Sequence, residues 1–122
     1  KVLRKLNKKG VYLQVSHAFH SPLMRGMEDD FRRVIDSLDL QQPLSIPLAS
    51  TVTGQVLPRG KIIDLEHWVK QLASPVLFAD AFKKGINGKK CDVLVEVGPK
   101  PILSKMAQSW WKQSDTQPEP LW

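Results

Sequence analysis

Two histidines, three residues apart, are the first candidates for chemistry in this chain. His17 and His20 lie between an alternating apolar segment, residues 11–15, and an amphipathic segment that begins after Pro22. That order predicts a strand, a loop and a helix, and in open α/β sheets ligands bind at such strand-to-helix loops. An imidazole there is suited to take and return a proton near neutral pH. The alternative is that both rings are ordinary loop residues with satisfied hydrogen bonds.

Other reactive groups are few. A His-x-x-His pair supplies two ligands, whereas a zinc site needs three or four. His67 and Cys91 are the remaining soft ligands and lie on different predicted elements, so we expect no metal site. Cys91 begins an apolar segment, where a cysteine behaves as a small hydrophobic residue. The sequence contains neither a Gly-rich phosphate loop nor a Gly-x-Ser-x-Gly motif.

Length and composition place the chain among single globular domains. It has 122 residues, of which 42% are hydrophobic and 25% charged, and a formal net charge of +6. The single cysteine excludes a disulfide-stapled scaffold. No apolar run approaches the roughly 20 residues of a membrane span, and we expect a cytoplasmic protein without a signal peptide. The positive charge is consistent with binding to an acidic protein, to a phosphate-bearing cofactor or to nucleic acid. The alternative is a solvated basic surface without a specific partner.

Apolar periodicity predicts strands that alternate with helices. The expected helices cover residues 1–9, 22–38, 64–72, 78–86 and 102–110, and the expected strands cover residues 11–15, 44–49 and 93–97. Ser21 is a plausible N-cap before Pro22, Asp64 can cap the helix that carries Leu65 to Leu72, and Gly54 marks a turn. Because residues 93–97 are apolar on both faces, they predict a central strand. The expected fold class is α/β with a largely parallel sheet.

Four short segments carry more information than the periodicity does. They read Val-Ser-His-Ala-Phe-His-Ser-Pro-Leu-Met (15–24), Ser-Thr-Val-Thr-Gly (50–54), Trp-Val-Lys-Gln-Leu with Pro-Val-Leu-Phe-Ala-Asp (68–72 and 75–80), and Val-Glu-Val-Gly-Pro-Lys-Pro-Ile-Leu (95–103). In this order they resemble the acyltransferase domains of modular polyketide synthases, relatives of the malonyl-CoA:acyl carrier protein transacylases of fatty acid synthesis. The resemblance extends over about residues 11–112.

The resemblance implies roles for four residues. His20 matches the catalytic histidine of the family, the general base that activates a serine nucleophile. Gln71, or an immediate neighbour, matches the position whose backbone carbonyl orients that histidine. His17 and Phe19 match the positions that select the substrate. A phenylalanine there fills the space that a methyl branch would need, which favours malonyl over methylmalonyl units.

The same resemblance implies a mechanism and a division of the chain. A serine would accept malonyl from malonyl-CoA and pass it to the phosphopantetheine thiol of an acyl carrier protein. Residues 1–15 would end a small ferredoxin-like subdomain, residues 16–112 would form the C-terminal part of the hydrolase-like catalytic core, and residues 113–122 would be a linker. The serine motif of the family, Gly-His-Ser-x-Gly, does not occur in this sequence.

The lone chain is therefore expected to be inactive and to need the N-terminal half of the same domain. Its other expected partners are malonyl-CoA, an acyl carrier protein and the neighbouring synthase domains, with no nucleic acid and no membrane. Two alternatives stay open at this point. One is a non-catalytic interaction module that docks a carrier protein. The other is a basic nucleic-acid binder, whose binding would weaken steeply with salt.

Overall fold

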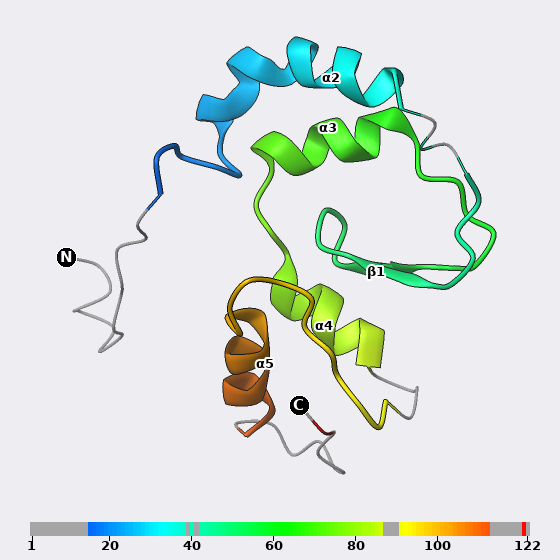
Figure 1. Cartoon of the computed structure of the whole chain (residues 1–122), viewed down its shortest axis with the longest axis vertical. Helices are drawn as coiled ribbons and strands as arrows, with labels where there is room; N and C mark the ends of the chain where they lie inside the picture. The colour runs from blue at the N-terminus through cyan, green and yellow to red at the C-terminus, as the bar shows by residue number, and fades with distance from the viewer. Residues whose placement is uncertain (1–14, 39, 41, 87–90, 113–120, 122) are drawn as a thin grey trace.

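A computed structural model describes residues 15–38, 40, 42–86, 91–112 and 121 of the chain. Its elements in chain order (Figure 1) are η1 (Pro22–Met27), α2 (Glu28–Asp36), β1 (Leu48–Ser50), β2 (Gln55–Leu57), α3 (Leu65–Ala73), α4 (Phe78–Ile86) and α5 (Leu103–Trp111). The fold of this part is α/β, with helices around one small antiparallel sheet. The helix predicted for residues 1–9 lies outside the described residues.

Two helix starts confirm the capping that the sequence predicts. Ser21 Oγ accepts a hydrogen bond from the backbone N–H of Leu23 at 3.3 Å, and Pro22 occupies the first position of η1. Asp64 Oδ1 accepts from the backbone N–H of His67 at 2.8 Å, which fixes the start of α3. The helix expected to follow Ser21 is divided, because its first six residues form a 3-10 helix before α2 begins. Short 3-10 segments are frequent at the ends of α-helices.

The two strands form a hairpin with the predicted turn at Gly54. β1 and β2 pair antiparallel, with Leu48 opposite Leu57 and Ser50 opposite Gln55. Gly54 has a φ of +64°, a left-handed conformation that glycine adopts without steric cost. The strand expected at residues 44–49 is shorter and begins after Pro47. A proline lacks the N–H that the ladder of a sheet requires.

The parallel sheet that we predicted does not form among the described residues. Residues 93–97 form no strand, and their only ladder contact is one parallel bridge between Val93 and Leu121. A parallel strand needs hydrogen-bonding neighbours along its length. The described residues offer only Leu121 for this purpose, so Val95 and Val97 remain 80% and 96% exposed. The strand predicted at residues 11–15 lies almost wholly outside the described residues.

The helices and the hairpin pack in two neighbouring groups (Figure 1). Helix α2 lies along α3, and the hairpin lies against α4. Among the described residues, few apolar side chains are buried: Met24, Ile63, Val69, Ala81, Ala107 and Trp111. Helix α5 joins α4 through the ring of Phe82, whose centroid lies 5.8 Å from Trp110 and 6.4 Å from Trp111. These ring contacts pack the last helix against α4.

Candidate functional site

His20 lies at the carbonyl end of helix α3. Its ring nitrogen Nδ1 is 2.8 Å from the backbone oxygen of Gln71, and its backbone N–H donates to the oxygen of Leu72 at 3.2 Å. The last carbonyls of a helix have no partner inside it, so His20 satisfies two of them. Its φ of +58° is uncommon outside glycine and turns the chain sharply enough to make both contacts.

This geometry determines which ring nitrogen of His20 can act as a base. A carbonyl oxygen only accepts hydrogen bonds, so the Nδ1 atom beside Gln71 carries the hydrogen. In the neutral ring the other nitrogen, Nε2, then has the free lone pair. An exposed imidazole with a fixed tautomer is suited to take a proton from a hydroxyl or thiol.

His17 and Phe19 lie on the same exposed loop as His20. The ring centroids of His17 and Phe19 are 5.9 Å apart, and the backbone N–H of Phe19 donates to the oxygen of His17 at 2.9 Å. His17 Nδ1 is also hydrogen-bonded to Ser16 Oγ at 2.9 Å. Phe19 is 51% exposed, so about half of its surface is open to a ligand beside the base.

A second pair of polar contacts joins the hairpin to helix α3. Ser50 Oγ is hydrogen-bonded to His67 Nε2 at 3.1 Å, and Thr51 Oγ1 donates to Gln71 Oε1 at 3.2 Å. Burial lowers the pKa of His67, and nearby Lys70 lowers it further against the opposing effect of Asp64. The neutral ring is therefore favoured beside Ser50.

Neither of these contacts was predicted from the sequence. The available signal was the spacing of His67 and Gln71, because residues four apart lie on the same face of a helix. Two polar residues at that spacing, beside the apolar positions Trp68 and Leu72, indicate a half-buried polar stripe. Their partners in the hairpin are 17 and 20 residues away, beyond the reach of helical or strand periodicity.

The other reactive groups stay apart. Within the described ranges, no three side chains of His, Cys, Asp or Glu come together as a metal site would require. Cys91 is half-buried, and its Sγ donates weakly to the oxygen of Val93 at 3.7 Å. Among the same residues, every helix is too short or too polar to cross a membrane.

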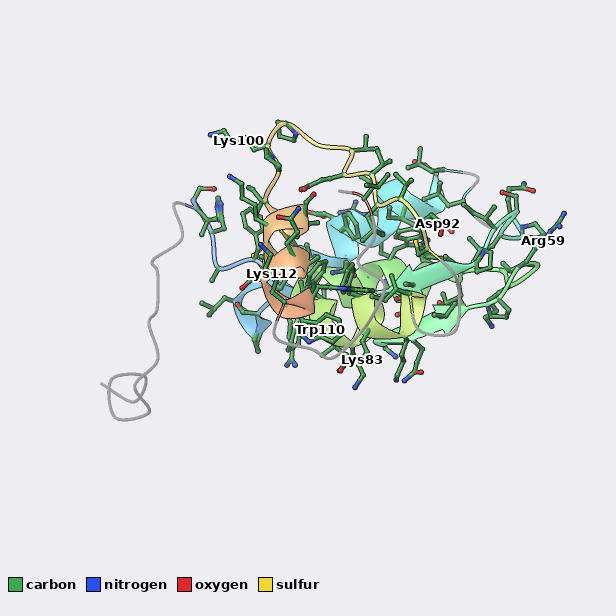
Figure 2. The ribbon with its side chains drawn as sticks, turned by 90° about the horizontal axis from the view of Figure 1, so that it is seen from below. Arg59, Lys83, Asp92, Lys100, Trp110 and Lys112 are labelled. Carbon is green, nitrogen blue, oxygen red and sulfur yellow. The ribbon has the colours of Figure 1, made fainter. Side chains whose placement is uncertain are left out.

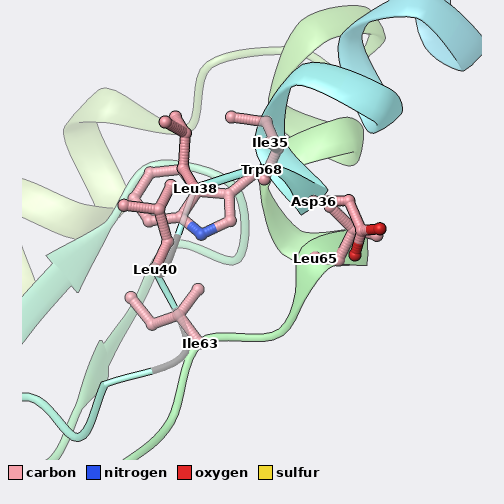
Figure 3. Close-up of a pocket in the computed structure, with 7 residues that line it drawn as sticks. All are labelled: Ile35, Asp36, Leu38, Leu40, Ile63, Leu65 and Trp68. Carbon is pink, nitrogen blue, oxygen red and sulfur yellow. The ribbon is translucent and has the colours of Figure 1, made fainter.

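Three hollows in the described part of the chain lie away from His20. The smallest of them, between α2 and α3 (Figure 3), has a volume of about 20 Å³ and is lined by Ile35, Asp36, Leu38, Leu40, Ile63, Leu65 and Trp68. That volume has room for about one water molecule, so it is not a substrate pocket. A second hollow, about 310 Å³, is a groove between α4, residues 94–97 and α5. The third, about 450 Å³, is a shallow hollow on α5 beside Met106 and Trp110. His20 lines none of them, and its ring lies on an open surface of the described residues.

Charge is distributed unevenly over the surface. Within the described residues, two ion pairs form, and both involve α2: Arg32 pairs with Glu66 of α3, and Arg33 pairs with Asp30. The exposed lysines Lys83, Lys100 and Lys112 extend outward from α4, the loop before α5 and the end of α5 (Figure 2). These lysines give the C-terminal part of the chain a basic surface.

Comparison of sequences places the chain beside polyketide synthases. Polyketide synthase GfsB of Streptomyces halstedii is 39% identical over 105 residues, which make up 86% of this chain and 2% of that protein. Naringenin synthase of Pestalotiopsis fici is 34% identical over 91 residues, or 74% of this chain and 3% of that protein. The chain thus spans only a small share of these relatives. No protein-family model matches it.

Comparison of structures narrows the match to one kind of domain. The acyltransferase domain from the second module of the salinomycin polyketide synthase has a TM-score of 0.79 and 38% identity, covering 98% of this chain and 26% of that one. The acyltransferase domain of an iterative polyketide synthase in enediyne biosynthesis has a TM-score of 0.73 and 38% identity, covering 89% and 28%. The chain therefore corresponds to about a quarter of such a domain.

Proposed function

This chain belongs to the acyltransferase domains of polyketide synthases, and from that premise we propose that it supplies the histidine base for loading malonyl units onto an acyl carrier protein. The observation that carries the proposal is the hydrogen bond between His20 Nδ1 and the Gln71 carbonyl. It leaves Nε2 as the basic nitrogen, and the carbonyl end of a helix favours the positive charge that a base acquires.

The proposed reaction has two halves. A serine hydroxyl attacks the thioester carbon of malonyl-CoA, the C–S bond breaks, and His20 moves the serine proton to the departing thiol of CoA. The phosphopantetheine thiol of the carrier protein then attacks the acyl-serine ester, and His20 returns the thiol proton to the serine oxygen. The 122 residues lack the Gly-His-Ser-x-Gly motif, so the serine comes from outside this chain. The chain alone is then inactive.

The division of the chain follows from the same proposal. Residues 1–15 end a ferredoxin-like subdomain, residues 16–112 belong to the C-terminal part of the hydrolase-like core, and residues 113–122 form a linker. The N-terminal half of the domain is the first partner, and it completes the core with a parallel sheet. The chain covers about a quarter of the solved acyltransferase domains, which supports the need for a partner that completes the core.

Two further partners carry negative charge. CoA has phosphates, and carrier proteins of the expected kind are acidic, so the exposed Lys83, Lys100 and Lys112 favour the approach of both. The same surface would serve a non-catalytic module that only docks a carrier protein. Acylation by the complete domain separates the two functions, because a docking module binds the carrier without transferring malonyl.

The role of His20 is tested in the complete acyltransferase domain. We expect His20→Ala to lower the rate of malonyl-enzyme formation from malonyl-CoA by about 10²- to 10⁴-fold. Intact mass spectrometry follows the adduct, and added imidazole should restore part of the rate without changing the thermal midpoint. Near-normal acylation by the variant would remove His20 from the mechanism. The isolated chain, treated in the same way, should gain no adduct.

Malonyl selectivity is tested at Phe19, whose exposed ring lies beside the loop of the base. In the complete domain, Phe19→Ser should lower the ratio of malonyl to methylmalonyl transfer by about 10-fold, because it opens space for one methyl group. Competition between the two CoA thioesters measures this ratio directly. An unchanged ratio would mean that Phe19 does not contact the acyl branch.

A further inference from the structure

We propose that the tip of the β1–β2 hairpin positions the histidine base, with Thr51 as the positioning residue that acts through the side chain of Gln71. This inference rests on the proposed role of His20, and it concerns what holds His20 rather than what His20 does. Thr51 touches neither the base nor the expected substrate. Its effect would pass through one residue of helix α3 that has contacts on both sides.

Gln71 makes those two contacts with different groups. Its side-chain oxygen accepts from Thr51 Oγ1 at 3.2 Å, and its backbone oxygen is 2.8 Å from His20 Nδ1. The hairpin and the base are thus joined through a single residue in the last turn of α3. The last turn of a helix is its least constrained part, because its carbonyls lack partners within the helix. A tether on the Gln71 side chain therefore limits where its carbonyl points.

The hairpin is hydrogen-bonded to one face of α3 at two positions. Ser50 contacts His67 at 3.1 Å, and Thr51 contacts Gln71 one helical turn later. Residues four apart on a helix are separated by about 6 Å along its axis. Two consecutive hairpin residues thus contact two successive turns of α3, and the two contacts together restrict its rotation and its translation. Ser50 is 4% exposed, so the first of these contacts is protected from water.

Thr51 is itself held firmly enough to act as an anchor. Its backbone oxygen accepts from the N–H of Leu77, just before α4, at 2.8 Å. The turn closes through the N–H of Gly54, which donates to the oxygen of Ser50 at 2.8 Å, and through the N–H of Val52, which donates to Ser50 Oγ at 3.1 Å. The hydroxyl of Thr51 thus presents a fixed donor to Gln71.

The test uses three variants of the complete acyltransferase domain. Thr51→Val keeps the shape of the side chain and removes the hydroxyl, Thr51→Ser keeps the hydroxyl, and Thr53→Val is the matched control. Thr53 lies in the same turn, but its hydroxyl bonds only locally, to the N–H of Gln55 at 3.3 Å. One lost hydrogen bond corresponds to a loss of about 3- to 10-fold. We expect that loss in kcat for Thr51→Val, with KM for malonyl-CoA unchanged, and near-normal rates for the other two.

Equal rates for Thr51→Val and Thr53→Val would overturn the inference, as would a loss that Thr51→Ser fails to rescue. Where Thr51→Val does not fold, Gln71→Met replaces it, since this change keeps the backbone carbonyl and removes the side-chain acceptor. The same kcat loss is then expected, and no loss would count against the inference. If His20→Ala is inactive while Thr51→Val is normal, only this inference fails. If His20→Ala is fully active, the proposed function itself fails.

Discussion

Two parts of the chain, residues 15–86 and residues 91–112, differ in how their polar side chains are hydrogen-bonded and how well their apolar side chains are covered. In the first, polar contacts cross between elements that are far apart in sequence, such as His20 with Gln71 and Thr51 with Gln71. In the second, the side-chain hydrogen bonds of Cys91 and Glu96 reach residues two to eight positions away, and Val93, Val95 and Val97 are exposed. The first part therefore holds the candidate site by its own contacts.

Residues 91–112 instead expose an apolar face to solvent. Val95 and Val97 alternate with the half-buried Leu94 and Glu96, so one face of the segment turns to solvent. Exposed apolar patches on a soluble protein mark sites where other protein surface packs. Because the chain covers about a quarter of the solved acyltransferase domains, we expect the remaining three quarters to provide that surface.

The largest expected effect tests whether this face is covered. In the complete domain, Val97→Asp should lower the free energy of unfolding by about 3 kcal/mol, because it would bury an unpaired carboxylate. The matched control is Lys100→Asp, which places the same carboxylate three residues later and should change stability by less than about 0.5 kcal/mol. Denaturant unfolding measures both. Equally small effects would mean that the face stays open, and the contrast between the two parts would disappear.

A smaller effect is expected at the hairpin of the first part. In Gly54→Ala the new Cβ would lie 3.0 Å from Asp80 Cβ, at a φ of +64°. We expect a loss of about 1–2 kcal/mol in unfolding free energy from the left-handed backbone alone. Gly26→Ala is the control, because nothing lies within 4 Å of its Cβ and its φ is not positive, so it should be neutral or slightly stabilising. Equal midpoints for the two variants in thermal unfolding would contradict the close packing of the turn.

The smallest effect concerns the local hydrogen bonds of the second part. The Glu96 carboxylate accepts from the backbone N–H groups of Ile102, Leu103 and Ser104 at 3.1, 3.0 and 2.9 Å, and also from the Ser104 hydroxyl. The Ser104 hydroxyl and these N–H groups lower the pKa of Glu96 to about 2. The carboxylate therefore stabilises the start of α5 above its ordinary pKa of 4.5, and that stabilisation is lost as the pH falls toward 2.

Amide hydrogen exchange at the start of α5 measures this stabilisation. Glu96 becomes protonated between about pH 5 and pH 2. Over this range, the protection of the amides at the start of α5 should decrease in the native protein, after correction for the intrinsic pH dependence of exchange. Glu96→Gln should show weaker protection and no such dependence, whereas Asp92→Asn, an exposed carboxylate on the same segment, should behave like the native protein. If the protection of Glu96→Gln still decreased at low pH, the pH dependence would arise from a group other than Glu96.

Local structure was predictable wherever it depends on nearby residues. Apolar spacing predicted α3, α4 and α5, and the caps at Ser21 and Asp64 are visible in the sequence because they act over two or three residues. The turn at Gly54 was predictable for the same reason. The parallel sheet was predicted wrongly for the described residues. The apolar pattern of residues 93–97 shows that both faces of the segment can be buried, but it does not show whether a neighbouring strand is present to pair with it.

The candidate site depends on contacts over longer distances. His20 and Gln71 are 51 residues apart, and no periodicity joins them. Only the resemblance to the acyltransferase family paired the histidine with a carbonyl near Gln71. The contacts of Ser50 and Thr51 with α3 were missed, because each depends on how the hairpin docks on the helix rather than on either segment alone.

The most direct test of the account is the tautomer of His20 in the complete domain, read from the ring ¹⁵N chemical shifts and the one-bond couplings of the bound hydrogen. For the neutral form of the ring we expect the hydrogen on Nδ1, bonded to the carbonyl of Gln71, and an unprotonated Nε2. The His20→Ala variant assigns the signal. A neutral ring with its hydrogen on Nε2 and none on Nδ1 would contradict the proposed role of His20, because that nitrogen could not accept the proton of a nucleophile.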